Sequence, residues 1–202
     1  MARRIVVATN NPDKFREIQE KLSALPLALQ SLADFPFCPK VTEDRPDLEG
    51  NAIKKATEVW RVVGQWTLAD DTGLEVAALG GAPGVYSARY SGPGATYESN
   101  CRKLLDVMRD VPDGKRAAAF WTVICLRTDD GLYCVEGVLE GTIGRARRGD
   151  GGFGYDPVFV LRDGRTLAEL SLAEKNRVSH RGQALDKMTA LLSHLLKTAE
   201  RS

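Results

Sequence analysis

A short apolar strand followed at once by a helix opens this chain, and that order constrains the fold more than any other feature. Ile5 to Ala8 form an apolar run, and Pro12 then suits the first turn of a helix. Apolar residues follow at helical spacing: Phe15, Ile18, Leu22 and Leu25. A strand that leads directly into a helix predicts an α/β fold.

Later segments continue the alternation of strands and helices. The hydrophobic spacing predicts helices over about 48–63, 96–111 and after 179, and strands over about 66–69, 116–127, 132–139 and 157–161. No internal repeat, low-complexity tract or linker interrupts the 202 residues. We therefore expect one domain over residues 1–202, large enough to form two small lobes.

The composition excludes several classes of protein. Hydrophobic residues make up 43% and charged residues 27%, which is ordinary for a soluble globular chain. The formal net charge of +1 provides no basic field for nucleic acid, so any polyphosphate site must be local. The longest apolar run, Ala117 to Leu126, is too short to span a membrane. We expect no nucleic-acid or membrane partner and, without an apolar targeting segment, a cytoplasmic location.

Four cysteines are present, and their spacing argues against a metal centre. None forms a CxxC pair, and only two histidines could complete a zinc site. Cys125 and Cys134 lie in apolar or alternating stretches. We expect them to be buried thiols.

The segment that joins the first strand to the first helix, Thr9-Asn10-Asn11-Pro12-Asp13-Lys14, is suited to an anion. Backbone N–H groups at a helix N-terminus favour negative charge, and Lys14 adds a cation. The spacing of a Walker motif is absent. The alternative interpretation is that Asn11 only caps the helix and that Lys14 is solvated.

An acidic pair, Asp70-Asp71, stands where the strand over 66–69 is expected to end. Adjacent carboxylates repel and are costly to bury, so a bound cation such as Mg²⁺ is a natural explanation. A carboxylate beside a metal could also deprotonate an attacking water. Glu43 and Glu49 are candidate further carboxylates, and spacing alone does not choose between them. The alternative is a solvated acidic turn.

A glycine-rich loop precedes the strand expected over 157–161. Its sequence is Gly151-Gly152-Phe153-Gly154-Tyr155-Asp156. Glycine permits close backbone approach to a ligand, and an aromatic face can stack on a base. The alternative is a tight loop whose Phe153 and Tyr155 fill the core.

The last polar cluster combines Lys175 with Ser179-His180-Arg181, immediately before the C-terminal helix. Its donors suit an anionic or oxygen-rich ligand. A lone histidine is more often structural than catalytic, but the neighbours of His180 favour a ligand contact. Together with the three upstream clusters, these residues indicate an enzyme that acts on a nucleotide.

With these residues in view, the chain resembles the inosine/xanthosine triphosphate pyrophosphatase (Ham1-like) family over nearly its whole length. The markers are Thr9-x-Asn11-x-x-Lys14, Asn51-Ala52 with Lys55, Ala69 to Leu74, Gly80 to Gly84, Tyr86 to Tyr90, Gly151 to Pro157, and Ser179-His180-Arg181. The family often has glycine at the position of Asn10 and serine at that of Thr72. Asparagine tolerates left-handed backbone and threonine keeps the hydroxyl, so neither departure disturbs the resemblance.

The resemblance implies an α/β fold of two lobes around a long central mixed sheet, with flanking helices and the active site in a cleft between the lobes. It also implies a homodimer and a divalent metal, usually Mg²⁺. The implied reaction cleaves the α–β phosphoanhydride of ITP, dITP or XTP, giving the nucleoside monophosphate and pyrophosphate and so cleansing the nucleotide pool.

The resemblance further implies roles for individual residues. Asp71 would be the catalytic proton acceptor and, with Glu43, a metal ligand. Residues expected at the triphosphate are Thr9, Asn10, Asn11, Lys14, Lys55 and Thr72. Residues expected at the base and its neighbouring groups are Phe153, Gly154, Tyr155, Asp156, Lys175, Ser179, His180 and Arg181.

Elementary chemistry supports such selectivity and also leaves alternatives open. Hypoxanthine and xanthine carry an oxygen acceptor at C6, where adenine carries an amino donor, so donors from His180 and Arg181 would oppose adenine. A non-catalytic nucleotide sensor would not need Asp70 and Asp71. A pyrophosphatase for ordinary or modified dNTPs would not need donors that recognise the 6-oxo group of a purine.

Overall fold

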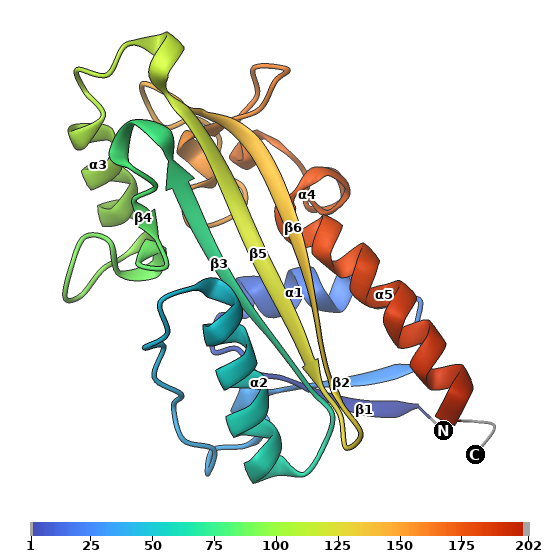
Figure 1. Ribbon diagram of the computed structural model, residues 1–202. Coiled ribbons are helices and arrows are strands. Elements are labelled where there is room, and N and C mark those ends of the chain that lie inside the picture. The colour runs from blue at the N-terminus through green and yellow to red at the C-terminus, as the bar shows by residue number, and fades with distance from the viewer. Residues whose placement is uncertain (1, 200–202) are drawn as a thin grey trace. The chain divides into compact units, whose positions relative to one another are not determined.

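The computed structural model describes residues 2–199 and shows an α/β architecture with a mixed sheet (Figure 1). The strands are β1 (Arg3–Val7), β2 (Leu27–Ser31), β3 (Thr67–Val76), β4 (Pro83–Gly84), β5 (Ala117–Arg127), β6 (Leu132–Ile143) and β7 (Phe159–Val160). The helices are α1 (Pro12–Lys21), α2 (Leu48–Val63), α3 (Tyr97–Val107), α4 (Leu172–Val178) and α5 (His180–Ala199). The α/β class predicted from the first strand and helix is confirmed.

The sheet has the strand order β2-β1-β3-β5-β6-β7, and β4 pairs with β3. β1 runs parallel to both β2 and β3, whereas β4 and β7 pair antiparallel to β3 and β6. The chain divides into two compact units. The first comprises Met1–Asp71, Thr122–Gly137 and Arg181–Ser202, and the second comprises Thr72–Trp121 and Val138–His180. Strands β3, β5 and β6 therefore contribute residues to both units.

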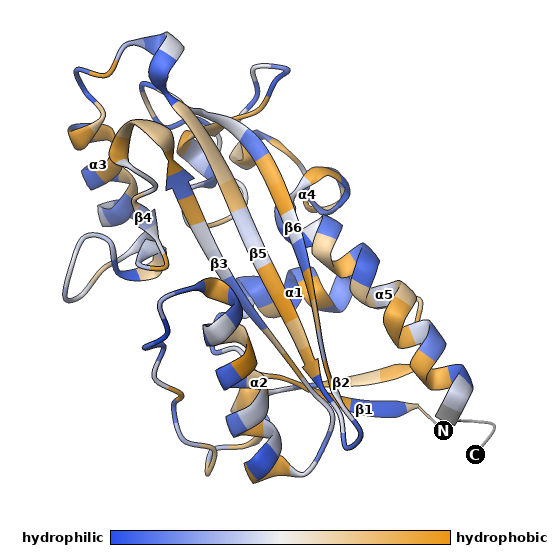
Figure 2. Cartoon of the chain, in the orientation of Figure 1, coloured by the Kyte–Doolittle hydropathy of each residue, from blue (hydrophilic) through white to orange (hydrophobic). Residues whose placement is uncertain are grey.

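In the first unit, helices cover both faces of the sheet. Ile18 of α1 and Leu185 of α5 pack with Leu68 on one face. Ala56 of α2 packs with Ala69 on the other. Figure 2 shows apolar and polar residues alternating around α2 and α5, as expected for helices that bury one side. Since side chains alternate along a strand, successive residues of β3 enter different layers.

The second unit has its own core, built around one face of its strands. Leu74 of β3 and Phe120 of β5 pack there with Leu104 of α3 and Phe159 of β7. Arg116 is buried in this unit, and its guanidinium donates to the carbonyls of Met108, Val111, Ile143 and Gly144. These four bonds join the end of α3 to the end of β6.

Several predicted boundaries are confirmed, and others need correction. The second helix spans the predicted Leu48–Val63, and the C-terminal helix begins directly after Ser179. The strand predicted to end before Asp70 continues to Val76, so the acidic pair lies inside a strand. Of the strand predicted over 157–161, residues 157 and 158 belong to a 3₁₀ turn, and only residues 159 and 160 form the short β7.

The two cysteines expected as buried thiols are joined. Cys125 of β5 and Cys134 of β6 form a disulfide, with Cα atoms 4.2 Å apart. The two cysteines lie on neighbouring strands of the sheet. Their separation of nine residues in the sequence did not by itself predict that they would pair. None of the helices in the described part of the chain combines the length and apolarity needed to cross a bilayer.

Candidate active site

The polar residues singled out in the sequence gather into two clusters, one in each unit. We call the first the aspartate cluster; its members are Lys14, Glu17, Glu43, Lys55, Asp70, Asp71 and Arg181. We call the second the glycine-loop cluster; its members are Phe153, Tyr155, Asp156, Lys175 and His180.

The strand geometry of β3 separates Asp70 from Asp71. Asp70 follows Leu68 on the face covered by α1 and α5, and Asp71 follows Ala69 on the face covered by α2. Both are buried, with 1% and 6% of their surfaces exposed. The repulsion inferred from their adjacency in sequence is thus relieved, because the carboxylates point to opposite sides of the sheet.

Asp70 is held by two cations from different helices. Its Oδ2 lies 2.9 Å from Lys14 Nζ of α1 and 3.1 Å from Arg181 Nη2 of α5. Burial alone would raise the pKa of Asp70, but Lys14 and Arg181 hold it well below the usual range. Asp70 therefore stays ionised and is poorly suited to exchange a proton.

Arg181 is the most enclosed member of the aspartate cluster. It is 1% exposed, and its Nη1 donates to Glu17 Oε2 at 2.6 Å. Its Nη2 donates to Asp70 Oδ2. Burial opposes the charge, but Glu17 and Asp70 raise the pKa of the guanidinium. Arg181 is thus bonded to two carboxylates of its own unit.

Asp71 has a different environment from its neighbour. Its Oδ1 accepts from Lys55 Nζ at 2.8 Å, and the same ammonium lies 2.8 Å from Glu43 Oε1 and 2.5 Å from the carbonyl oxygen of Asp70. Burial raises the pKa of Asp71 more than Lys55 lowers it. Burial would lower the pKa of Lys55, but Asp71, Asp70 and Glu43 together raise it. Asp71 is therefore the carboxylate of the pair that can take up a proton.

The segment before α1 is organised as a helix cap. The Oδ1 of Asn11 accepts from the backbone N–H groups of Asp13 and Lys14, and Thr9 Oγ1 accepts from the N–H of Asn11. Asn10 is exposed. Asn11 is thus a cap, as one interpretation held, but Lys14 is ion-paired rather than solvated, and burial lowers its pKa.

In the glycine-loop cluster, Asp156 organises its neighbours. Its Oδ2 accepts from Lys175 Nζ at 2.5 Å and from the N–H of Phe153 at 2.8 Å. The same ammonium lies 4.3 Å from the centre of the Phe153 ring, and Tyr97 packs against that ring at 5.8 Å. Asp156 and Lys175 are each 2% exposed, so this pair is internal.

The remaining predicted residues of the second unit are held by packing and backbone contacts. The hydroxyl of Tyr155 donates to the carbonyl of Ser87 at 2.8 Å, and burial raises its pKa. The carbonyl of Gly154 accepts from the thiol of Cys101. His180 stacks on Phe120 with ring centres 4.5 Å apart. Ser179 is buried at the C-terminus of α4, and Thr72 is half-buried on β3.

The sequence did not reveal Glu17, Phe120 or Tyr97 as residues of these clusters, and it indicated Ser87 only as part of the run Tyr86 to Tyr90. Glu17 had a detectable signal, because it follows Lys14 by one helical turn and adjoins the apolar Ile18. A carboxylate on the buried side of a helix requires a cation. The partner, Arg181, is 164 residues away in sequence, so no local pattern identified it.

Two carboxylates offer oxygen ligands for a hard cation. Glu43 and Asp71 converge on the single ammonium of Lys55, so their oxygens lie within reach of one position. Mg²⁺ is commonly bound by one or two carboxylates together with waters and substrate phosphates. The described residues contain no group of three or more His, Cys, Asp or Glu side chains arranged for a metal. The pair thus offers two carboxylates of the kind that such an ion takes, both of them ion-paired to Lys55 here.

Comparisons with known proteins place these residues in a family. Residues 5–191 match the Ham1 family. The dITP/XTP pyrophosphatase of Desulfotalea psychrophila is 48% identical over 198 residues, covering 97% of this chain and 88% of that protein. The dITP/XTP pyrophosphatase of Geobacter sulfurreducens is 52% identical over 184 residues, covering 90% and 92%. The solved structure of a HAM1 protein from Coxiella burnetii has a TM-score of 0.86 and 40% identity, and the match covers 95% of this chain and 99% of that one.

Two glycines of the loop provide a matched test of the Asp156–Lys175 pair. Gly152 and Gly154 have φ of +68° and +63°, so alanine is strained at both. A Cβ at Gly152 would clash with Asp156 Oδ2, whereas a Cβ at Gly154 meets nothing within 4 Å. We predict that Gly152→Ala lowers the free energy of unfolding by about 3–5 kcal/mol more than Gly154→Ala, because it breaks a buried ion pair. Denaturant titration measures both, and equal losses would contradict the assignment.

Proposed function

This chain belongs to the Ham1 family, and from that membership we propose that it is a nucleoside triphosphate pyrophosphohydrolase. The proposed substrates are ITP, dITP and XTP, and the proposed products are the nucleoside monophosphate and pyrophosphate. The names of the relatives support dITP and XTP, and ITP is added because it carries the same base as dITP. The observation that carries the chemistry is Asp71, a buried carboxylate of raised pKa beside the ammonium of Lys55.

In the proposed reaction, water attacks the α-phosphorus, and the bond between this atom and the α–β bridging oxygen breaks. Asp71 accepts the proton that this water loses, and its raised pKa brings its basicity closer to that of a general base working near neutral pH. Pyrophosphate leaves with the bridging oxygen and its added negative charge. Lys14 and Lys55 supply positive charge to the phosphates, because phosphoryl transfer depends mainly on positioning and charge neutralisation.

A divalent cation belongs to this proposal. Glu43 and Asp71 would hold it, and when bound it would neutralise phosphate charge and polarise the oxygens that it contacts. Thr9, Asn10, Asn11 and Thr72 are proposed at the triphosphate. A homodimer and a cytoplasmic location remain predictions.

For the base, we propose that Phe153, Gly154, Tyr155 and Asp156 shape the site and that Lys175 and His180 provide donors toward a 6-oxo purine. Ser179 supports His180 from the end of α4. Arg181 has its guanidinium bonded to Glu17 and Asp70, so we propose that it holds Asp70 in place. Asp70 in turn orients Lys14.

Replacing each aspartate separates their roles. We predict that Asp71→Asn stays folded, since Lys55 keeps Glu43 and the Asp70 carbonyl as acceptors, but lowers kcat about 10²–10⁴-fold. Asp70→Asn should instead lower the free energy of unfolding, because Lys14 and Arg181 lose their shared carboxylate. Steady-state kinetics and denaturant titration measure the two effects. A fully active Asp71→Asn beside a folded but inactive Asp70→Asn would reverse the assignment.

The pH profile follows from the same carboxylate. A base must be deprotonated, so activity is lost as the pH falls through the pKa of Asp71. Because burial raises that pKa in the metal-free protein, the Asp71 carboxyl should titrate there above the value of an ordinary aspartate, about 3.9. The measurement is the carboxyl ¹³C chemical shift against pH without Mg²⁺, with Asp71→Asn to assign the signal. Titration of Asp71 at or below the ordinary value would contradict the prediction.

A panel of nucleotides tests the function itself. We expect ITP, dITP and XTP to be hydrolysed in the presence of Mg²⁺ to monophosphate and pyrophosphate, identified by ³¹P NMR, and excess EDTA to abolish the reaction. Release of orthophosphate, or full activity in EDTA, would contradict the proposal. Binding without turnover would identify a nucleotide sensor, and preference for ordinary dNTPs would identify a different pyrophosphatase.

His180→Phe tests whether His180 contributes a hydrogen bond to recognition of the base, and it preserves the stacking on Phe120. The variant loses its N–H donors but keeps an aromatic ring of similar size. We expect kcat/KM for ITP relative to ATP to fall about 3- to 10-fold, as for one neutral hydrogen bond. Parallel changes for the two substrates would show that His180 acts through packing alone.

A further inference from the structure

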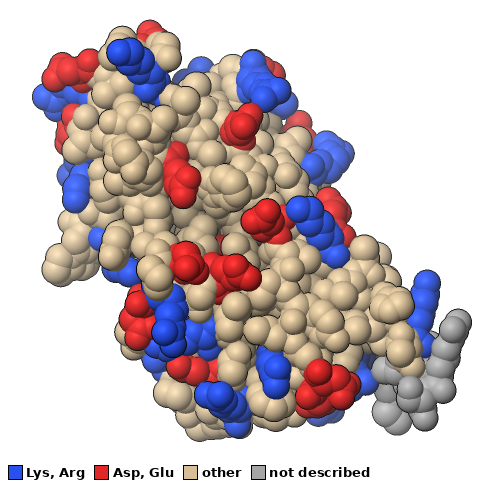
Figure 3. Space-filling model, viewed as in Figure 1, with Lys and Arg blue, Asp and Glu red and all other residues tan. Residues whose placement is uncertain are grey.

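Helix α3 carries an asparagine among the apolar residues of its buried side. Asn100 is 3% exposed, whereas Cys101 and Leu104, the other buried residues of α3, belong to the apolar core. The outer side of α3 carries exposed ion pairs such as Glu98–Arg102, and Figure 3 shows basic and acidic side chains on this edge of the second unit. Asparagine is a poor helix former, and a buried amide is destabilising unless it is hydrogen-bonded. Neither helix formation nor core packing therefore explains Asn100.

The amide of Asn100 holds the segment from Ser87 to Ser91. Its Oδ1 accepts from the backbone N–H of Ser91 at 2.7 Å. Its Nδ2 donates to the carbonyl oxygens of Ser87 and Ala88 at 3.3 and 3.2 Å. These three hydrogen bonds join one side chain of α3 to the backbone of one short segment. Asn100 therefore fixes that segment relative to α3.

Ser87 carries this constraint to the glycine-rich loop. Its carbonyl oxygen also accepts from the hydroxyl of Tyr155 at 2.8 Å. A carbonyl oxygen accepts two hydrogen bonds, so Asn100 and Tyr155 together occupy it. The side chain of Ser87 is fixed as well, because its Oγ accepts from the N–H of Leu74 at 2.8 Å and donates to the carbonyl of Gly84 at 2.6 Å. Ser87 thus joins β3, α3 and the loop.

Two further residues on the same face of α3 contact the loop. Tyr97 packs against Phe153, and the thiol of Cys101 donates to the carbonyl of Gly154. Together with Asn100 they lie at positions i, i+3 and i+4 of the helix, so the three side chains are neighbours on one face. Three successive residues of the loop are thus held from this face of α3.

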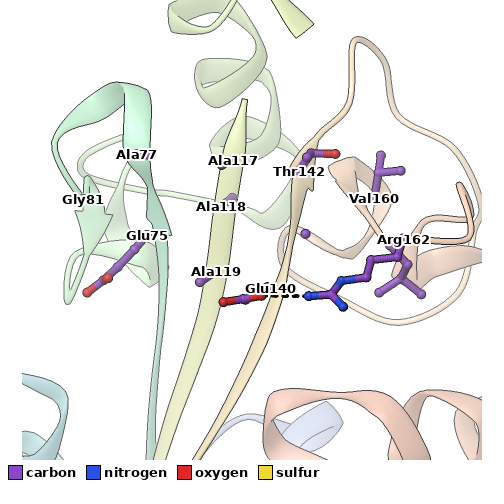
Figure 4. A pocket seen from close by; sticks show the side chains of 12 residues that line it. Glu75, Ala77, Gly81, Ala117, Ala118, Ala119, Glu140, Thr142, Val160 and Arg162 are labelled. Atoms are coloured by element: carbon purple, nitrogen blue, oxygen red, sulfur yellow. Dashed lines mark hydrogen bonds and ion pairs between the residues drawn. The ribbon is translucent and has the colours of Figure 1, made fainter. Parts of the chain in front are cut away.

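The opposite face of the sheet in the second unit is separate from the loop. A groove of about 710 Å³ lies there, lined on β5 by Ala117 and Ala119 (Figure 4). The other residues that line it lie on or next to β3, β6 and β7, and none belongs to the loop. The contacts of α3 with the loop are therefore made on the core side of the sheet.

We propose that Asn100 is a positioning residue for selection of the base. It fixes the carbonyl of Ser87, which fixes Tyr155 within the loop. Tyr155 is followed by Asp156, whose carboxylate holds Lys175, one of the donors proposed for the 6-oxo group. The inference rests on the proposed function, and it gives Asn100 no contact with the nucleotide.

Positioning matters here because hydrogen bonds weaken steeply when donor and acceptor lose their geometry. A donor displaced from the 6-oxo group discriminates less between hypoxanthine and adenine. A loop released from Ser87 should therefore treat ITP and ATP more alike.

A double-mutant cycle tests the route from Asn100 to the loop. Asn100→Ala removes the donor to Ser87, and Tyr155→Phe removes the hydroxyl while keeping the buried ring. Each should lower kcat/KM for ITP relative to ATP about 3- to 10-fold, as for the loss of one neutral hydrogen bond. If Asn100 acts through Tyr155, the double variant should lose little more than the more affected single variant, whereas independent effects multiply.

Lys103→Met is the matched control. Lys103 also lies on α3 and donates to the same segment, at the carbonyl of Tyr90, but this bond does not involve Ser87 or Tyr155. Its ratio of ITP to ATP should equal that of the wild type. Asn100→Ser, which is uncharged and keeps a polar group in the core, replaces Asn100→Ala in the cycle should the alanine variant not fold.

A purely structural role of Asn100 predicts a different result. Loss of folded protein lowers the rates for both substrates equally and leaves their ratio unchanged. An unchanged ratio in a folded Asn100 variant or in Tyr155→Phe, or losses that multiply in the double variant, would overturn the inference alone. A wild-type protein without preference for ITP over ATP would overturn the proposed function and this inference with it.

Discussion

The aspartate cluster depends on one constraint, which is that consecutive side chains of a strand point to opposite faces. Asp70 and Asp71 are adjacent in sequence, but each is buried in a different helical layer and needs its own counter-charge. Lys14 and Arg181 meet Asp70, and Lys55 meets Asp71. A buried carboxylate without such a partner is strongly destabilising, so α1, α2 and α5 are tied to β3 by charge as well as by packing.

The same constraint gives two identical side chains different chemistry. Asp70 shares two cations, and they hold its pKa low despite burial. Asp71 faces one ammonium that Glu43 also uses, so desolvation prevails and its pKa rises. Separating the proton affinities of neighbouring carboxylates is a general means of assigning acid and base roles. Here the separation follows from the number of cations that each layer presents.

Local patterns in the sequence predicted the elements better than their contacts. The bounds of α2 and the start of α5 were predicted correctly, because the spacing of apolar residues within a segment indicates a helix without reference to the rest of the chain. The continuation of β3 through Asp70 and Asp71 was missed, because buried charges interrupt an apolar pattern. Likewise, the partners of Arg181 lie on other segments of the first unit, 111 and 164 residues away, and the disulfide joins neighbouring strands. Such contacts depend on how the segments assemble.

The run from Ala117 to Leu126 shows why one apolar strand can serve two purposes. In the first unit both of its faces are covered, since Ile124 packs with α5 and Cys125 packs with α2. A continuous apolar sequence is required there. In the second unit only the face of Ala118 and Phe120 is covered, yet the opposite positions remain apolar. Burial within the chain accounts for the first part of the pattern, whereas in the second part it accounts only for the face of Ala118 and Phe120.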